Sequence, residues 1–174
     1  MADVPALQEL IAQSVRGLSI GFYSQKQIEV SLADVFGVDT GLLDDETYYV
    51  ITNDGAPVAA GGWSARRTLF GGSHMKPSAA DPRLDPATEP ARIRAFFVHP
   101  NYARKGLARQ LYTRCAHEAY AAGFRNFELM ATLPGKPLYD ALGFEPIHAV
   151  SLPMNGETLL PLVHMRRSIA QVPS

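Results

Sequence analysis

The sequence contains a single cysteine, no long apolar run and no excess of charge of either sign. Cys115 alone cannot form an internal disulfide framework or a multi-cysteine zinc site, so we expect a reducing compartment and no metal. The 16 Lys and Arg residues nearly balance the 17 Asp and Glu residues, so no global field would attract nucleic acid or an anionic membrane. No run approaches the roughly 18 apolar residues of a membrane span, and the N-terminus lacks a signal-peptide pattern. We therefore expect a cytoplasmic protein.

The residues that are present suffice for one core, because 47% of the 174 residues are hydrophobic. We expect one domain over residues 1–174. Apolar spacing distinguishes helices from strands, and Ser24 with Gln27 forms a capping box at the start of the second helix. The order of elements predicts an α+β fold with a central strand–helix–strand crossover. The predicted helices cover residues 3–18, 24–36, 107–122 and 136–142, and the predicted strands cover residues 47–52, 56–70, 92–99, 125–131, 145–152 and 158–167.

A long segment without apolar periodicity, residues 71–91, separates the first predicted hairpin from the next strand. It contains four prolines, which oppose regular structure. A loop of this length within a compact domain is usually functional or disordered. We interpret it as a candidate lid.

The stretch VHPNYARKGLARQLY, residues 98–112, passes from a predicted strand directly into a helix. The unpaired N–H groups and the dipole at a helix N-terminus attract anions. Gly106 has no Cβ to keep a ligand away, and Arg104, Lys105 and Arg109 supply cations suited to phosphate. The P-loop and dinucleotide-binding patterns are absent. On these residues alone, a phosphate site and an ordinary turn with solvated cations are equally open.

This stretch and PLYDALGFEPI, residues 137–147, together resemble two motifs of the GNAT superfamily of acyl-CoA-dependent N-acyltransferases. The first resembles the family's Q/R-x-x-G-x-G/A motif, with Ala103, Gly106 and Ala108 at its defined positions, and the second resembles its L-Y-x-x-L-G-F segment. The resemblance implies the GNAT fold, a mixed central sheet that is splayed at the cofactor site and flanked by helices. Chains of the family generally begin with a strand before the first helix, so we expect that strand to be missing here.

The resemblance also implies acetyl-CoA as the acyl donor and a small-molecule or peptide amine as the acceptor, with direct attack in a ternary complex. Tyr139 would donate a proton to the departing thiolate, although a tyrosine on a short helix is otherwise usually a packing residue. Phe97 and Val98 would bind the pantetheine arm, and one of their amides would polarise the thioester carbonyl. Ala103 lacks the usual Gln or Arg side chain but keeps the backbone groups. The pyrophosphate would be held by Arg104, Lys105, Gly106, Leu107, Ala108 and Arg109.

The acceptor amine must lose a proton before it attacks, and the sequence offers two candidate bases. Many GNAT enzymes place a Glu on the strand before the phosphate turn, where this sequence has Arg92 and Arg94. Glu89 at the edge of that strand and His74 in the long loop are the remaining candidates.

The acceptor pocket should be formed by aromatic and cationic residues near the first hairpin and the first two helices. Phe22, Tyr23, Trp63 and Arg66 are the candidates, although Trp63 taken alone is better explained as a core residue. A homodimer is common in the family. The alternative to an enzyme is a catalytically inactive acyl-CoA-binding sensor or interaction module of the same fold, whereas a nucleotide-binding regulator would leave LYDALGF unexplained.

Overall fold

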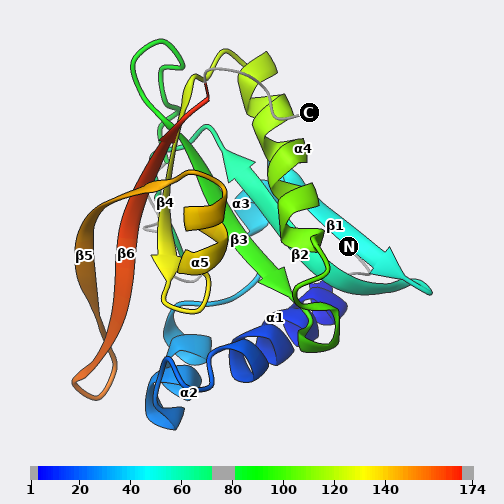
Figure 1. Cartoon of the computed structure of the whole chain (residues 1–174), viewed down its shortest axis with the longest axis vertical. Coiled ribbons are helices and arrows are strands. Elements are labelled where there is room, and N and C mark those ends of the chain that lie inside the picture. The colour runs from blue at the N-terminus through cyan, green and yellow to red at the C-terminus, as the bar shows by residue number, and fades with distance from the viewer. Residues whose placement is uncertain (1–3, 72–80, 170–174) are drawn as a thin grey trace.

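The computed structural model describes residues 4–71 and 81–169, which form one mixed six-stranded sheet with helices packed on both of its faces (Figure 1). The order along the sheet is β1-β2-β3-β4-β6-β5. This arrangement confirms the predicted α+β fold and its crossover, because β3, α4 and β4 follow one another and the two strands are parallel. The helices are α1 (Val4–Leu18), α2 (Gln25–Asp34), α3 (Thr40–Asp44), α4 (Leu107–Ala121) and α5 (Lys136–Ala141), and the strands are β1 (Tyr48–Asn53), β2 (Ala56–Ser64), β3 (Ala91–Val98), β4 (Asn126–Thr132), β5 (Glu145–Met154) and β6 (Thr158–Ser168).

Two apolar clusters cover the two faces of the sheet, since successive side chains of a strand point to opposite sides. In β4, Phe127 and Leu129 pack in the cluster under α4 and α5, whereas Met130 packs in the cluster under α1 and α2. Figure 1 shows α4 and α5 on one side of the sheet, with α1 and α2 together below it in this view. Apolar side chains therefore hold the helices to both faces of the sheet.

The start of α2 has the predicted capping box. The backbone N–H of Gln27 donates to Oγ of Ser24 over 3.2 Å, and the backbone N–H of Ser24 donates to Oε1 of Gln27 over 2.9 Å. These bonds satisfy donors that the first helical turn leaves unpaired. The capping box therefore fixes Ser24 as the residue at which the short connection between α1 and α2 ends and α2 starts.

Two elements differ from the prediction. The strand predicted over residues 56–70 ends at Ser64, because Arg66 turns away to make an isolated bridge with Arg83. The short helix α3 was not predicted. It begins at Thr40, and its N-cap residue is Asp39, whose side chain accepts a hydrogen bond from the backbone N–H of Gly41 over 3.1 Å. Five helical residues are too few to show apolar periodicity, so the Asp39 cap was the signal available.

The centre of the sheet is split, because β3 and β4 pair only at Ala91 with Phe127 and at Arg92 with Glu128. Beyond these pairs the two strands diverge toward α1 (Figure 1). On its other side β3 carries a bulge, where the register with β2 shifts and Ala95 has φ +54°. A bulge bends its strand and increases the local twist. The bulge and the short pairing together open the sheet at one end of β3.

Gly61 lies opposite the bulge, and the ring of Phe96 packs so closely against its backbone that there is no room for a side chain. A Cβ at this position would lie 2.5 Å from Cδ2 and 2.7 Å from Cε2 of Phe96, so Gly61→Ala must displace that ring. We expect Gly61→Ala to lower the free energy of unfolding by about 1–3 kcal/mol, measured by urea denaturation. In a Phe96→Ala background the same substitution should cost much less. An equal cost in both backgrounds would show that the ring is not the cause.

Candidate functional site

A cavity of about 700 Å³ lies between β3 and β4, beyond the positions at which they pair. This volume is within the range of pockets that bind small ligands. The wall combines residues of α1, the gap-facing parts of β3 and β4, the start of α4 and the helix α5. Of the residues predicted for the site, the wall includes Phe22, Phe97, Val98, Arg104, Gly106, Leu107, Ala108, Arg109 and Tyr139.

The turn before α4 has the geometry of an anion site. Gly106 is the N-cap residue with φ +81°, and no side chain caps the helix, so the first N–H groups of α4 lack a side-chain acceptor. A Cβ on Gly106 would meet no other atom within 4 Å among the described residues, so the space beside this backbone is open. Arg104 and Arg109 also line the cavity, whereas Lys105 lies with Nζ 4.9 Å from the ring centre of Tyr102.

The side chain of Tyr139 faces the same cavity from α5. Its ring packs against Phe96 and Phe144, with centres 6.5 Å and 5.6 Å away, and the residue is 8% exposed. Burial raises the pKa of Tyr139 well above its ordinary value, so the phenol keeps its proton at neutral and mildly alkaline pH. Within the described part of the chain its hydroxyl has no hydrogen-bond partner. The site therefore contains a protonated, uncommitted phenol.

The two predicted β3 amides face opposite edges of the strand. Phe97 pairs with Ala60 of β2, and the backbone N–H of the following His99 donates to the carbonyl of Val58 over 2.9 Å. Because N–H directions alternate along a strand, the Val98 N–H points away from β2, and it donates to Oγ of Ser14 on α1 over 3.1 Å. Of the two, the Val98 amide is the one that faces the gap.

Three of the four predicted acceptor residues lie outside the cavity wall, and only Phe22, 49% exposed, lines it. The Tyr23 hydroxyl donates to the carbonyl of Pro161 over 2.6 Å and accepts from the N–H of Leu133 over 2.9 Å, and burial raises its pKa to about 12. Trp63 is buried in the core beside Phe124. These two aromatic residues therefore stabilise the fold.

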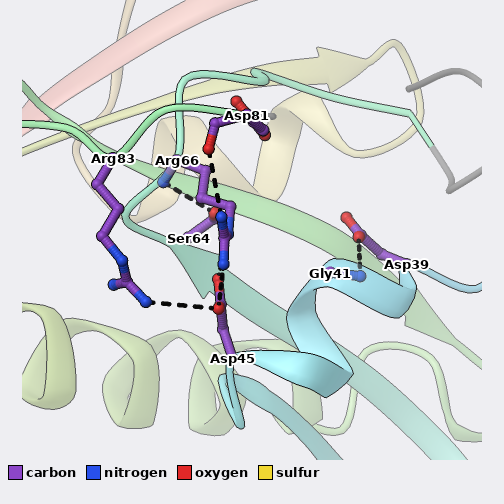
Figure 2. Close-up of polar contacts among 7 residues, drawn as sticks. All are labelled: Asp39, Gly41, Asp45, Ser64, Arg66, Asp81 and Arg83. Carbon is purple, nitrogen blue, oxygen red and sulfur yellow. Dashed lines mark hydrogen bonds and ion pairs between the residues drawn. The ribbon is translucent and has the colours of Figure 1, made fainter. Parts of the chain in front are cut away.

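Arg66 belongs to a polar network that ties down the segment after β2 (Figure 2). Its Nε and Nη2 atoms each donate to Asp45 over 2.6 Å, and Nη1 donates to the carbonyl of Asp81 over 3.2 Å. Arg83 approaches the same Asp45 carboxylate at 3.6 Å. Figure 2 shows Arg66 and Arg83 converging on Asp45, while Asp39 lies apart at the start of α3. The guanidinium of Arg66 is thus engaged outside the cavity.

Glu89, one of the two predicted bases, is not among the described residues of the cavity wall. Glu89 accepts from the backbone N–H of Asp85 over 2.8 Å and forms an ion pair with Arg67 at 3.1 Å. His74 lies outside the described residues. The wall, as far as it is described, contains no carboxylate, and its charged residues are Arg94, Arg104 and Arg109.

The prediction missed a buried ion pair beside the cavity. Nη2 of Arg94 on β3 lies 2.7 Å from Oδ2 of Asp39, and the two side chains are only 2% and 1% exposed. Arg94 also donates to the carbonyls of Thr68 and Gly71 over 3.2 Å and 2.8 Å. Burial lowers the pKa of Arg94, and the Asp39 carboxylate acts in the opposite direction. An arginine within the apolar run of β3 was the available signal that a buried partner must exist.

The sequence matches the Acetyltransferase (GNAT) family over residues 13–144. This chain therefore belongs to the GNAT family of acetyltransferases, as its two motifs predicted. The family uses acetyl-CoA and acetylates amine acceptors, so membership implies acyl transfer at the level of the family. Among curated proteins, none matches the sequence significantly.

Solved structures of the family share the fold. A GCN5-related N-acetyltransferase from Rhodopseudomonas palustris has a TM-score of 0.67 at 18% identity, with 96% of this chain and 90% of that chain covered. The PaiA N-acetyltransferase from Thermoplasma acidophilum, solved in complex with coenzyme A, has a TM-score of 0.62 at 12% identity, with 96% and 93% covered. The ribosomal-protein-S18-alanine N-acetyltransferase of Escherichia coli has a TM-score of 0.56 at 18% identity, with 100% and 92% covered.

The helices were also compared with the length and hydropathy that a membrane span requires. Throughout residues 4–71 and 81–169, each helix is too short or too polar to qualify as a candidate membrane span.

Proposed function

We propose that this protein transfers an acetyl group from acetyl-CoA to a primary amine of a small-molecule or peptide acceptor by direct attack in a ternary complex. The observation that carries the proposal is a single cavity that contains both the uncapped start of α4 and Tyr139. The acyl donor carries a diphosphate, which requires an anion site. It also releases a thiolate, which requires a proton donor.

Different residues along the cavity bind different parts of the acyl donor. The N–H groups at the start of α4 bind the diphosphate, Gly106 allows close approach of the backbone, and Arg104 and Arg109 add positive charge. Acetyl-CoA supplies the activated thioester. The β3 edge at Val98 faces the pantetheine arm, and Tyr139 donates its phenolic proton to the leaving sulfur. The residues position the donor and neutralise charge as it develops.

One observation favours the second candidate function, a catalytically inactive acyl-CoA-binding module. No carboxylate lines the described wall, so a base for the attacking amine is not evident there. An ordered water chain or an acceptor that arrives as the free amine would remove this requirement. The presence of Tyr139, which binding alone does not need, favours the enzyme.

Thermal unfolding with CoA, acetyl-CoA and ATP, followed by an acceptor screen that detects free CoA, tests these proposals. Stabilisation by both CoA species and CoA release with an amine would support the enzyme. Stabilisation without release across amino acids, polyamines and peptide N-termini would support the binding module. Stabilisation by ATP alone would refute both.

Gly106→Ala tests the proposed diphosphate contact. The added Cβ would enter the open space beside the turn and would strain a backbone with φ +81°. We expect the affinity for CoA, measured by calorimetry, to fall at least about tenfold, which corresponds to roughly 1.4 kcal/mol. Gly55→Ala is the matched control, since Gly55 has φ +80° and equally open surroundings but lies outside the cavity wall. Equal losses in the two variants would contradict a contact at Gly106.

A further inference from the structure

Ser14 is a buried hydroxyl at the point where α1 meets the open edge of β3. The residue is 5% exposed, it lines the cavity, and its Oγ accepts the hydrogen bond from the Val98 N–H over 3.1 Å. A serine in the middle of a helix often directs its hydroxyl to a carbonyl of its own helix. Ser31 does this, since its Oγ donates to the carbonyl of Ile28 over 2.8 Å. Ser14 instead uses its oxygen to bond another element.

The proton of the Ser14 hydroxyl remains uncommitted. A serine hydroxyl has one donor and two acceptor positions, and the bond from Val98 uses an acceptor position. Among the described residues, no acceptor receives the Ser14 proton. A buried donor without an acceptor is unfavourable, so the hydroxyl favours a ligand that brings an acceptor to this place.

We propose, on the basis of the proposed function, that the Ser14 hydroxyl donates a hydrogen bond to a carbonyl oxygen of the pantetheine arm of the acyl donor. The Val98 N–H, the Ser14 O–H and that carbonyl then form a continuous chain of hydrogen bonds from β3 into the cavity. Each bond in such a chain polarises the next, so the amide strengthens the hydroxyl as a donor. Ser14 is thereby a binding residue for the acyl donor.

An arrangement in which the Ser14 hydroxyl blocks the Val98 amide predicts the opposite change in affinity. If the Ser14 hydroxyl only occupied the Val98 amide, a ligand carbonyl would have to displace it to reach that N–H. Removal of the hydroxyl would then free the amide and tighten binding. The direction of the change in affinity therefore separates the two arrangements.

The experiment compares Ser14→Ala with the parent protein for two ligands, coenzyme A and adenosine 3′,5′-bisphosphate, by calorimetry. The second ligand lacks the pantetheine arm. We expect Ser14→Ala to weaken CoA binding about three- to tenfold, the range for loss of one neutral hydrogen bond, and to leave the binding of the bisphosphate unchanged. Ser31→Ala is the matched control, because it removes a buried serine hydroxyl outside the cavity wall and should change neither affinity.

Unchanged or tighter CoA binding by Ser14→Ala would overturn the inference. So would an equal loss for both ligands, which would indicate a general disturbance of the site. If Ser14→Ala were poorly folded, Ser14→Cys, a weaker donor of similar size, should give an intermediate loss for CoA alone, and equal losses there would overturn the inference too. Failure of the parent protein to bind CoA would instead refute the proposed function.

Discussion

Asp39→Ala is expected to lower the free energy of unfolding by about 3–5 kcal/mol, the cost of leaving one partner of a buried ion pair without the other. The Arg94 side chain, 2% exposed, would lose the carboxylate that lies 2.7 Å from its Nη2 atom. The helix α3 would at the same time lose the side chain that bonds the N–H of Gly41. Denaturation by urea, with the slope checked for a two-state transition, measures the effect.

An exposed pair provides the control for this prediction. Arg16 and Glu29 form a similar contact at 2.9 Å, but their side chains are 55% and 44% exposed and the solvent screens their charges, so Glu29→Ala should be far less destabilising than Asp39→Ala. The double substitution Asp39→Ala with Arg94→Met, which removes both charges, should be more stable than Asp39→Ala alone. If Asp39→Ala were no more costly than Glu29→Ala, the buried pair would not be a main support of this corner of the cavity.

Tyr139→Phe is expected to lower kcat about 100-fold and to leave KM for acetyl-CoA nearly unchanged. The phenyl ring preserves the contacts with Phe96 and Phe144, so only the proton donor is lost. Burial raises the pKa of Tyr139, and the acid form is the active one. Ionisation of this phenol should therefore not limit activity as the pH rises to the ordinary tyrosine pKa of about 10, while the free amine becomes more abundant. Release of free CoA with an amine found in the acceptor screen measures the rate.

Tyr112→Phe is the matched control for Tyr139→Phe. Tyr112 also packs against Phe144, with ring centres 5.7 Å apart, and its hydroxyl accepts a hydrogen bond from Arg167 over 3.0 Å outside the cavity wall. Loss of that hydroxyl should affect stability more than kcat. If Tyr139→Phe kept kcat within about twofold of the parent rate, Tyr139 would not be the proton donor.

The parts of the fold that the sequence predicted correctly are those that local chemistry determines. The capping box at Ser24, the helix predicted over residues 107–122 and the glycine turn at Gly106 each depend on residues within a few positions of one another. The two motifs likewise identified the family before any geometry was known. Helical spacing and turn chemistry are local, so a single sequence is sufficient for them.

The parts that the sequence could not predict depend on contacts between distant segments. Asp39 and Arg94 are far apart in the chain, and nothing local shows that they meet. Arg66 resembled an acceptor-binding residue until the structure paired it with Asp45. The bulge at Ala95 has φ +54°, a value that usually indicates glycine, but the residue is alanine, so the sequence contains no signal for the bulge. Such features arise from tertiary packing, which outweighs local preference.

The early parting of β3 from β4 creates a strand edge in the middle of a sheet. Exposed edges normally invite pairing with other chains and so promote aggregation. Here residues of β4, α1 and the start of α4 flank the edge and line the cavity beside it. Under the proposed function, the acyl donor occupies this gap and covers the edge of β3 that another strand would otherwise reach.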